Sequence, residues 1–279
     1  MSTTEHKPIR ACLFDMDGLL LNTEDIYTKV KNIILAENGR PSLPWSIKAQ
    51  LQGRPGLMAT NVFFEWAQLE ISREEYHKRS AELYSEFFPS CSPLPGVPEL
   101  LETLSIATTP SGLPIEVALA TSSITRSFEL KTAHLPDLFK YFPKNQQIRG
   151  DDPRIPHGRG KPAPDIYLVA LESINARLRS EGKTVILPDE CLVFEDAVPG
   201  VEAGRRAGMR VVWIPHKELR KEFAGKEEEI LAGIPMMSSA EGEVVEENKK
   251  IGQVGDGWGE LREWIVGFDY ARYGIQVKK

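Results

Sequence analysis

Short apolar runs recur along this chain and alternate with segments of helical periodicity. Each run is bounded by polar or glycine residues, the pattern of a buried strand. The runs span residues 9–14, 115–120, 191–194 and 210–214. Amphipathic helix faces lie between them, one formed by Val97, Leu100, Leu101 and Leu104 and another by Ile166, Ala170 and Ile174. The alternation predicts βαβ units and an α/β fold with a mostly parallel sheet.

Residues 22–94 interrupt the alternation, because this stretch carries helical patterns without a convincing strand. Its first helix begins with the acidic pair Glu24 and Asp25, which suits a helix N-terminus. Its apolar face consists of Ile26, Val30, Ile33 and Ile34, and further helical stretches follow around residues 57–69 and 73–88. We therefore expect a helical domain over residues 21–94, inserted into a core made of residues 1–20 and 95–279.

The periodicity weakens after Pro215. Residues 217–257 are rich in Glu, Lys and Gly and predict a helix followed by a mobile surface segment. Helical spacing then returns at Trp258, Leu261, Trp264 and Ile265, which predicts a C-terminal helix packed on the core.

Composition narrows the class of protein. The 279 residues are 41% hydrophobic and 27% charged, as in an ordinary globular protein, and no apolar run is long enough to span a bilayer. The N-terminal residues lack the apolar segment of a secretory signal, and the three cysteines, Cys12, Cys91 and Cys191, read as buried free thiols. We expect a cytoplasmic protein that binds no membrane. A net charge of −6 also argues against a nucleic-acid binder, although a small phosphorylated ligand needs only a few local donors.

Four groups of polar residues stand at predicted strand ends or helix starts. They are Asp15–Asp17, Thr121–Ser123, Gly160–Pro162 and Glu195–Asp196. Each alone has an ordinary explanation, such as a turn, a helix cap or a surface lysine. Parallel strands, however, deliver their C-terminal ends to one edge of the sheet, where ligands bind in open α/β folds. The joint occurrence indicates a functional site at that edge, with Lys161 reaching into it.

Phosphoryl transfer through a covalent aspartyl intermediate suits these residue types. Asp15 is the candidate nucleophile, and Asp17 the group that protonates the leaving oxygen and later deprotonates water. Thr121 and Lys161 are expected to bind the other phosphate oxygens, with Gly18 and Ser122 completing the substrate-binding set.

Adjacent carboxylates at a buried strand end also indicate a hard cation such as Mg²⁺. The candidate ligands are Asp15, the backbone carbonyl of Asp17, and Asp196, while Glu195 would orient a metal-bound water.

Substrate choice is expected to lie in the helical insert. Arg54, within Gly53–Pro55, is the best candidate for an insert residue that reaches the substrate, and a bridge between insert helices is nearly as good an explanation. The stretch Arg149–Arg159, with His157 and three arginines, fits loop electrostatics almost as well as substrate binding.

The motifs FDMDG, ATSS, GKPAPD and FEDAVPGVEAGRRAGM resemble the signature of the haloacid dehalogenase (HAD) superfamily of phosphohydrolases over residues 8–216. The resemblance implies a Rossmann-like core with an inserted α-helical cap, Mg²⁺ dependence and the roles given above. Asp17 argues against a true dehalogenase, a branch that lacks the second acid. Longer segments are similar to the branch that contains pseudouridine-5′-phosphatase and DL-glycerol-3-phosphatases, with Asn22 in place of the usual Asp and longer stretches at 178–188 and 217–257.

Three functions therefore remain open. The leading hypothesis is hydrolysis of a small phosphomonoester, a nucleoside, polyol or sugar phosphate such as pseudouridine 5′-phosphate or glycerol 3-phosphate. A sugar phosphomutase of the β-phosphoglucomutase kind would share the same motifs. A noncatalytic HAD-like scaffold or regulator is the third, although such proteins usually lose one or more of the acids. The expected partner is a small phosphorylated metabolite; the oligomeric state stays open, with a monomer slightly favoured.

Overall fold

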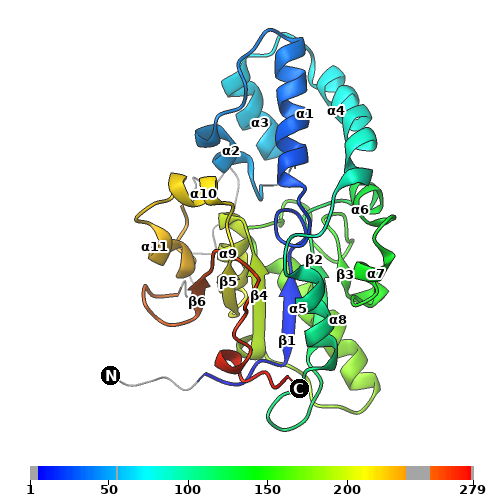
Figure 1. Ribbon diagram of the computed structural model, residues 1–279, viewed down its shortest axis with the longest axis vertical. Helices are drawn as coiled ribbons and strands as arrows, with labels where there is room; N and C mark the ends of the chain where they lie inside the picture. The colour runs from blue at the N-terminus through cyan, green and yellow to red at the C-terminus, as the bar shows by residue number, and fades with distance from the viewer. Residues whose placement is uncertain (1–5, 55, 237–251, 278–279) are drawn as a thin grey trace.

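A parallel six-stranded sheet forms the centre of the protein (Figure 1). The structure is a computed structural model and describes residues 6–54, 56–236 and 252–277. The strands run in the order β3-β2-β1-β4-β5-β6, and each pair of neighbours is parallel. Their bounds are β1 Ala11–Phe14, β2 Glu116–Ala120, β3 Gln147–Ile148, β4 Cys191–Glu195, β5 Arg210–Trp213 and β6 Gly259–Leu261. The α/β class and the parallel sheet expected from the sequence are confirmed.

The central strand β1 shows why these apolar runs become strands. Cys12 and Phe14 point into the hydrophobic cluster on one face of the sheet, and Ala11 and Leu13 into the cluster on the other. A parallel strand covered on both faces is hydrophobic at every position, because neither face meets water. The four predicted strands lie within two residues of the observed ones, and β3 and β6 are additional.

Helices cover both faces of the sheet (Figure 1). α5, α6 and α7 contribute to the cluster on one face, and α8, α9 and α11 to the cluster on the other. Their bounds are α5 Val97–Ile106, α6 Thr125–Thr132, α7 Pro136–Phe139, α8 Asp165–Ser180, α9 Val198–Arg206, α10 Lys217–Glu222 and α11 Glu227–Leu231. Short 3₁₀ helices span Phe88–Ser90, Lys144–Gln146, Pro188–Glu190 and Ala271–Tyr273. The two predicted helix faces are buried in α5 and α8.

Four helices between β1 and β2 form a layer at the end of the sheet, drawn at the top of Figure 1. We call α1 Glu24–Glu37, α2 Trp45–Leu51, α3 Gly56–Ala67 and α4 Arg73–Phe87 the four-helix layer. The layer has its own hydrophobic cluster, with Val30, Ile34 and Phe63 fully buried. A capping box of Ser72 and Glu75 starts α4, since each side chain satisfies backbone groups of the other. These helices follow the expected insert, although α2 was not anticipated, and the domain boundaries at residues 20 and 95 stay a prediction.

The predicted C-terminal helix at residues 258–265 is wrong. Residues Gly259–Leu261 form β6, which pairs with β5, and Trp264 is 59% exposed. Gly259 fits the strand because a Cβ there would press on Leu231 of α11. The described chain beyond β6 is irregular apart from the 3₁₀ helix Ala271–Tyr273, and its buried side chains are Ile265, Phe268, Tyr273 and Ile275.

The stretch at 217–257 contains two short helices, α10 and α11, where one was predicted, and Leu219 and Ile230 bury their side chains. Residues 237–251 of the predicted mobile segment lie outside the described residues.

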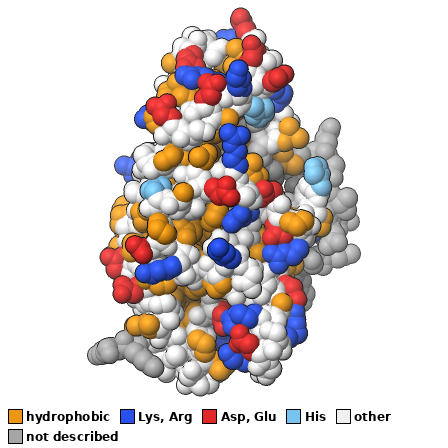
Figure 2. Space-filling view, turned by 90° about the vertical axis from the view of Figure 1, so that its right-hand side faces the viewer, with side chains coloured by type: hydrophobic (Ala, Val, Ile, Leu, Met, Phe, Trp, Pro, Cys, Tyr) orange, Lys and Arg blue, Asp and Glu red, His pale blue; other side chains and the backbone are white. Residues whose placement is uncertain are grey.

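The three cysteines are free and buried, as predicted. Among the described residues no helix combines the length and apolar character needed to cross a bilayer. On the face that Figure 2 shows, acidic and basic side chains are interspersed with hydrophobic ones.

Candidate active site

The polar groups singled out in the sequence converge at the C-terminal edge of the sheet, facing the four-helix layer (Figure 1). Asp15 directly follows β1, and its backbone N–H donates to the carbonyl of Phe194 in β4. Glu195 is the last residue of β4, and Asp196 follows it. Lys161 arrives from the loop before α8. The side-by-side pairing of β1 and β4 therefore determines the position of three acids.

Asp15, Glu195 and Asp196 form a compact acidic group. One carboxylate oxygen from each lies within 4.8 Å of the others, and all three residues are buried. Burial raises the pKa of Asp15 to about 7, opposed by Lys161 and reinforced by Glu195 and Asp17. Burial likewise raises the pKa of Asp196 well above its usual range, with Asp15 and Glu195 adding to the shift. Lys161 is too little positive charge to offset three buried acids, as expected of a site that binds a cation.

Lys161 bridges two of these acids. Its Nζ donates to Asp15 Oδ1 and to Glu195 Oε1, each at 2.5 Å. The Tyr167 hydroxyl also donates to Glu195 Oε1 at 2.5 Å, and the backbone N–H groups of Asp196 and Ala197 donate to Oε2. Glu195 is thus held by four donors while Lys161 fixes Asp15. Tyr167 was not singled out in the sequence, where it reads as one more residue of an amphipathic helix.

Asp17 points to a different set of partners. Oδ1 accepts from Lys131 Nζ at 2.5 Å and from Thr23 at 2.7 Å, while Oδ2 accepts from Ser123 at 2.7 Å. Burial alone would raise the pKa of Asp17, but the charge of Lys131 and these hydrogen bonds outweigh it and lower the pKa below its ordinary value. The structure therefore holds Asp17 as an ionised carboxylate.

Lys131 is a residue that sequence reasoning missed. It is fully buried on α6, where it also donates to Tyr27 at 2.7 Å and to Ser123 at 2.8 Å. Nothing in the local sequence distinguishes it from a surface lysine, because only the packing of α6 against the chain near Phe88 buries it.

The residues of the Thr121–Ser123 group differ in position, since Thr121 is buried next to Asp17 and the two serines line the cavity. Thr121 is fully buried; its Oγ1 accepts from the Ser123 N–H at 3.1 Å and lies 3.5 Å from Asp17 Oδ2. Ser122 and Ser123 line the cavity above the acids. The phosphate contacts expected of Thr121 and Ser122 remain predictions.

Two glycines allow the acids to come close. Gly18 has a φ of +82°, and a Cβ there would overlap the Asp196 carboxylate. At Gly200, at the start of α9, a Cβ would overlap the Glu195 carboxyl group. The expectation that Gly18 binds substrate is untested; its observed role is to make room for Asp196.

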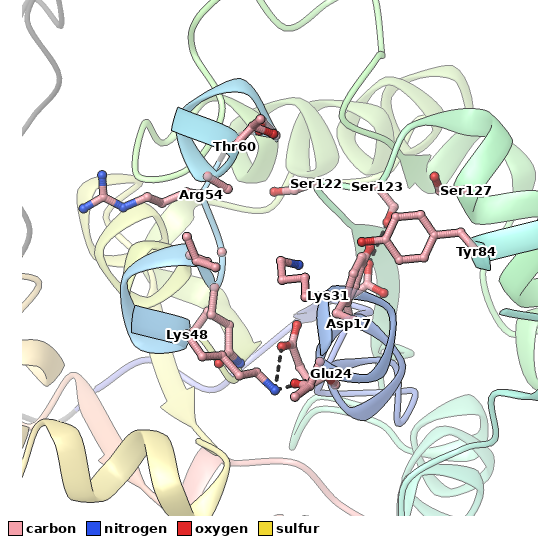
Figure 3. A pocket seen from close by; sticks show the side chains of 18 of the residues that line it. Asp17, Glu24, Lys31, Lys48, Arg54, Thr60, Tyr84, Ser122, Ser123 and Ser127 are labelled. Carbon is pink, nitrogen blue, oxygen red and sulfur yellow. Dashed lines mark hydrogen bonds and ion pairs between the residues drawn. The ribbon is translucent and has the colours of Figure 1, made fainter. Parts of the chain in front are cut away.

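A cavity of about 380 Å³ separates the acids from the four-helix layer. Figure 3 shows Lys31 projecting into its middle, with Ser122 on one side and Glu24 on the other. Arg54 lines the cavity, but its side chain extends away from Ser122 and Asp17 (Figure 3). The layer also touches the acids directly, since Gln52 Nε2 donates to Asp196 Oδ2 at 2.5 Å. A substrate contact for Arg54 stays a prediction, and Gln52 had no signal in the sequence.

The arginine-rich stretch 149–159 forms ion pairs of its own. Arg154 pairs with Asp152 at 2.7 Å and Arg159 with Asp165 at 2.8 Å. Both pairs favour the interpretation of this stretch as loop electrostatics over substrate binding.

Comparison with known proteins agrees with this geometry. The model of the haloacid dehalogenase-like hydrolase family matches residues 9–208. A Saccharomyces cerevisiae protein named "Probable pseudouridine-5′-phosphatase" is 44% identical, covering 81% of this chain and 90% of its own length. The (DL)-glycerol-3-phosphatase 2 of Arabidopsis thaliana is 36% identical, covering 74% of this chain and 80% of its own.

A solved structure shares the fold. The crystal structure of CbbY from Rhodobacter sphaeroides in complex with phosphate superposes with a TM-score of 0.59 at 22% identity, covering 78% of this chain and 91% of the other. The family match, the two relatives and the acids at the sheet edge lead to one conclusion: the chain belongs to the haloacid dehalogenase-like hydrolases.

Proposed function

We propose that this protein is a Mg²⁺-dependent phosphatase that hydrolyses a small phosphomonoester through a phosphorylated Asp15. The observation that carries the proposal is the meeting of Asp15, Glu195, Asp196 and Lys161 at one edge of the sheet beneath a cavity lined by the four-helix layer. The names of the yeast and plant relatives, which describe phosphatases of small phosphorylated compounds, support the same reaction class.

The carboxylate of Asp15 is suited to attack phosphorus. In the first step an Asp15 oxygen forms a bond to phosphorus while the bond from phosphorus to the ester oxygen breaks. In the second step water attacks the same phosphorus, the bond to Asp15 breaks, and inorganic phosphate leaves. Lys161, fixed 2.5 Å from Asp15 Oδ1, keeps positive charge next to the oxygens that gain negative charge in both steps.

Asp17 is the candidate proton carrier. It would protonate the departing ester oxygen in the first step and accept the proton of water in the second. In the structure Lys131, Thr23 and Ser123 hold its carboxylate in the ionised form. Proton donation to a substrate therefore requires Asp17 to rotate away from Lys131, a motion that substrate binding would have to favour.

The donor set fits a hard divalent cation. Asp15 and Asp196 supply carboxylate oxygens, Glu195 lies within the same 4.8 Å group, and the Asp17 carbonyl is the fourth candidate. The raised pKa values of Asp15 and Asp196 mark a buried acidic group with too little positive charge around it. A bound Mg²⁺ would supply that charge and offset the repulsion between Asp15 and an incoming phosphate dianion.

The cavity suits a small molecule. A volume of about 380 Å³ holds a phosphoryl group and a small alcohol, and residues of the four-helix layer line the side opposite the acids. We propose that this layer acts as a cap whose side chains contact the leaving group.

Phosphate release tests the proposal. The purified protein with Mg²⁺ is offered a panel of phosphomonoesters that includes pseudouridine 5′-phosphate and glycerol 3-phosphate, and inorganic phosphate is measured without any bisphosphate activator. We expect turnover that EDTA abolishes and Mg²⁺ restores. Turnover only in the presence of a sugar bisphosphate would indicate a mutase instead, and no turnover of any compound would contradict the phosphatase.

A further inference from the structure

Lys31 presents a cation to the substrate side of the cavity. Helix α1 crosses this side, and Tyr27, Thr28 and Lys31 share the face that lines it, because residues three and four apart lie on one side of a helix. Figure 3 shows the Lys31 ammonium in the open middle of the cavity.

Lys31 differs from the other lysines around the cavity in its contacts. Lys161 binds Asp15 and Glu195, and Lys131 binds Asp17. Lys48 binds the Glu24 carboxylate at 3.4 Å and its carbonyl at 3.1 Å. Within residues 6–54, 56–236 and 252–277, no hydrogen bond or ion pair reaches the Lys31 ammonium, which lies 5.2 Å from the centre of the Tyr27 ring.

A partly buried cation without a bonded partner is destabilised. Burial lowers the pKa of Lys31 to about 8, partly offset by Glu24 and reinforced by Lys48. The Glu24 carboxylate pairs with Lys48 at 3.4 Å rather than with Lys31. An anionic oxygen from a ligand would supply the missing partner and favour the charged ammonium.

The position of Lys31 separates it from the phosphate-binding side. The phosphoryl group is expected at Asp15 and Lys161 on the sheet, whereas Lys31 lies on α1 in the four-helix layer. A group that meets Lys31 is therefore on the alcohol part of the ester.

We propose that Lys31 forms a subsite for a negatively charged oxygen group, a carboxylate or a second phosphate, on the leaving group of the substrate. The proposal rests on the proposed function, since it places the substrate phosphate at Asp15. It assigns the substrate to the class of small phosphomonoesters that carry a second anionic group. Such an ester is discriminated from its uncharged analogue by one charge-assisted hydrogen bond.

The test compares 3-phosphoglycerate with glycerol 3-phosphate, two esters that differ by a carboxylate in place of a CH₂OH group. The kcat/KM ratio of the first to the second is measured for wild type, Lys31→Met and Lys31→Arg with Mg²⁺. We expect wild type to prefer 3-phosphoglycerate, Lys31→Met to lower the ratio about 10- to 100-fold, mainly through KM, and Lys31→Arg to retain most of it. Lys29→Met is the matched control, because it removes the same charge from an exposed position of α1 that lies against Phe87, outside the cavity.

A binding measurement distinguishes an error in the subsite proposal from an error in the proposed function. Dissociation constants for both compounds are measured calorimetrically in the Asp15→Asn protein with Mg²⁺, with and without Lys31→Met. Loss of selective 3-phosphoglycerate binding in the Lys31 variant supports the subsite even if wild type turns over neither compound. A change of less than about threefold in the binding ratio overturns it, as does an equal change in Lys29→Met, because a charge-assisted bond is worth more than that.

Discussion

Replacing Lys131 with methionine should destabilise the protein in a pH-dependent way. Lys131 is fully buried and contacts Asp17 at 2.5 Å, while the Asp17 side chain is 16% exposed. Methionine fills most of the same volume but leaves Asp17 with the hydroxyl donors Thr23 and Ser123 and no cation. Removing one partner of a buried ion pair costs about 3–5 kcal/mol, so we expect a loss of unfolding free energy of that order at pH 8.

The pH dependence follows from the sign of the Asp17 pKa shift. In wild type the pKa of Asp17 is lowered, so its contribution to stability is present above the unfolded-chain value of about 3.9 and is lost only as the pH falls through the folded-state pKa. Without Lys131, burial is no longer outweighed and the folded-state pKa of Asp17 should rise above the unfolded value. A raised carboxyl pKa makes stability fall as the pH rises, so the deficit should be smaller at pH 5 than at pH 8.

Urea unfolding followed by tryptophan fluorescence, in EDTA at both pH values, measures this difference. The double variant Lys131→Met/Asp17→Asn is the control, because it removes the unpaired charge and should abolish the pH dependence of the deficit. A deficit that is equal at pH 5 and pH 8, and that persists in the double variant, would refute the reasoning and reduce Lys131 to a packing residue.

Other perturbations test the rest of the site. Asp15→Asn should lower phosphate release by about 10³-fold or more in a rate assay, and activity within tenfold of wild type would remove the nucleophile assignment. Mg²⁺ at about 100 times its Kd should stabilise the EDTA-treated protein by about 2.7 kcal/mol in thermal unfolding, and an equal shift in Asp196→Asn would contradict the proposed ligand set. Gly18→Ala should lower the unfolding free energy by about 1–3 kcal/mol, because its φ is +82° and a Cβ would overlap Asp196; an unchanged urea midpoint would disprove the close approach. Tyr167→Phe should lower the unfolding free energy by about 1–2 kcal/mol, because it removes the hydrogen bond to Glu195. An unchanged urea unfolding midpoint would show that this hydrogen bond does not stabilise the protein.

The strands that the sequence predicted are those buried on both faces. A run such as Ala11–Phe14 is apolar at every position for that reason, and its ends are marked by polar residues. Strand β3 has two residues and β6 has three, too few for any periodicity, and each exists only because a longer strand is there to pair with it. Helical spacing at residues 258–265 was coincidental, since irregular chain buries Ile265 and Phe268 equally well.

The site residues likewise fall into those that the sequence could place and those that it could not. Asp15, Glu195 and Asp196 could be placed together because strand ends determine where their backbones lie. The orientation of Asp17 toward Lys131 could not be predicted, because nothing in the sequence of α6 shows that this lysine is buried. Lys31 on α1 and Gln52, which follows α2, reach the site because these helices pack over the sheet, and that packing has no signature in the chain.

The pairing of β1 with both β2 and β4 has a consequence for biosynthesis. Phe14 lies beside Leu119 and Phe194, so β1 gains its first neighbour only when β2 has been made and its second only with β4. Until β2 is made, an apolar strand ending in two acids stays unpaired, while the local contacts of α1–α4 are already able to form. Nascent chains that stop before Glu116 should therefore carry a folded helical layer attached to the unpaired, aggregation-prone strand β1, and depend on chaperones until β2 and β4 arrive.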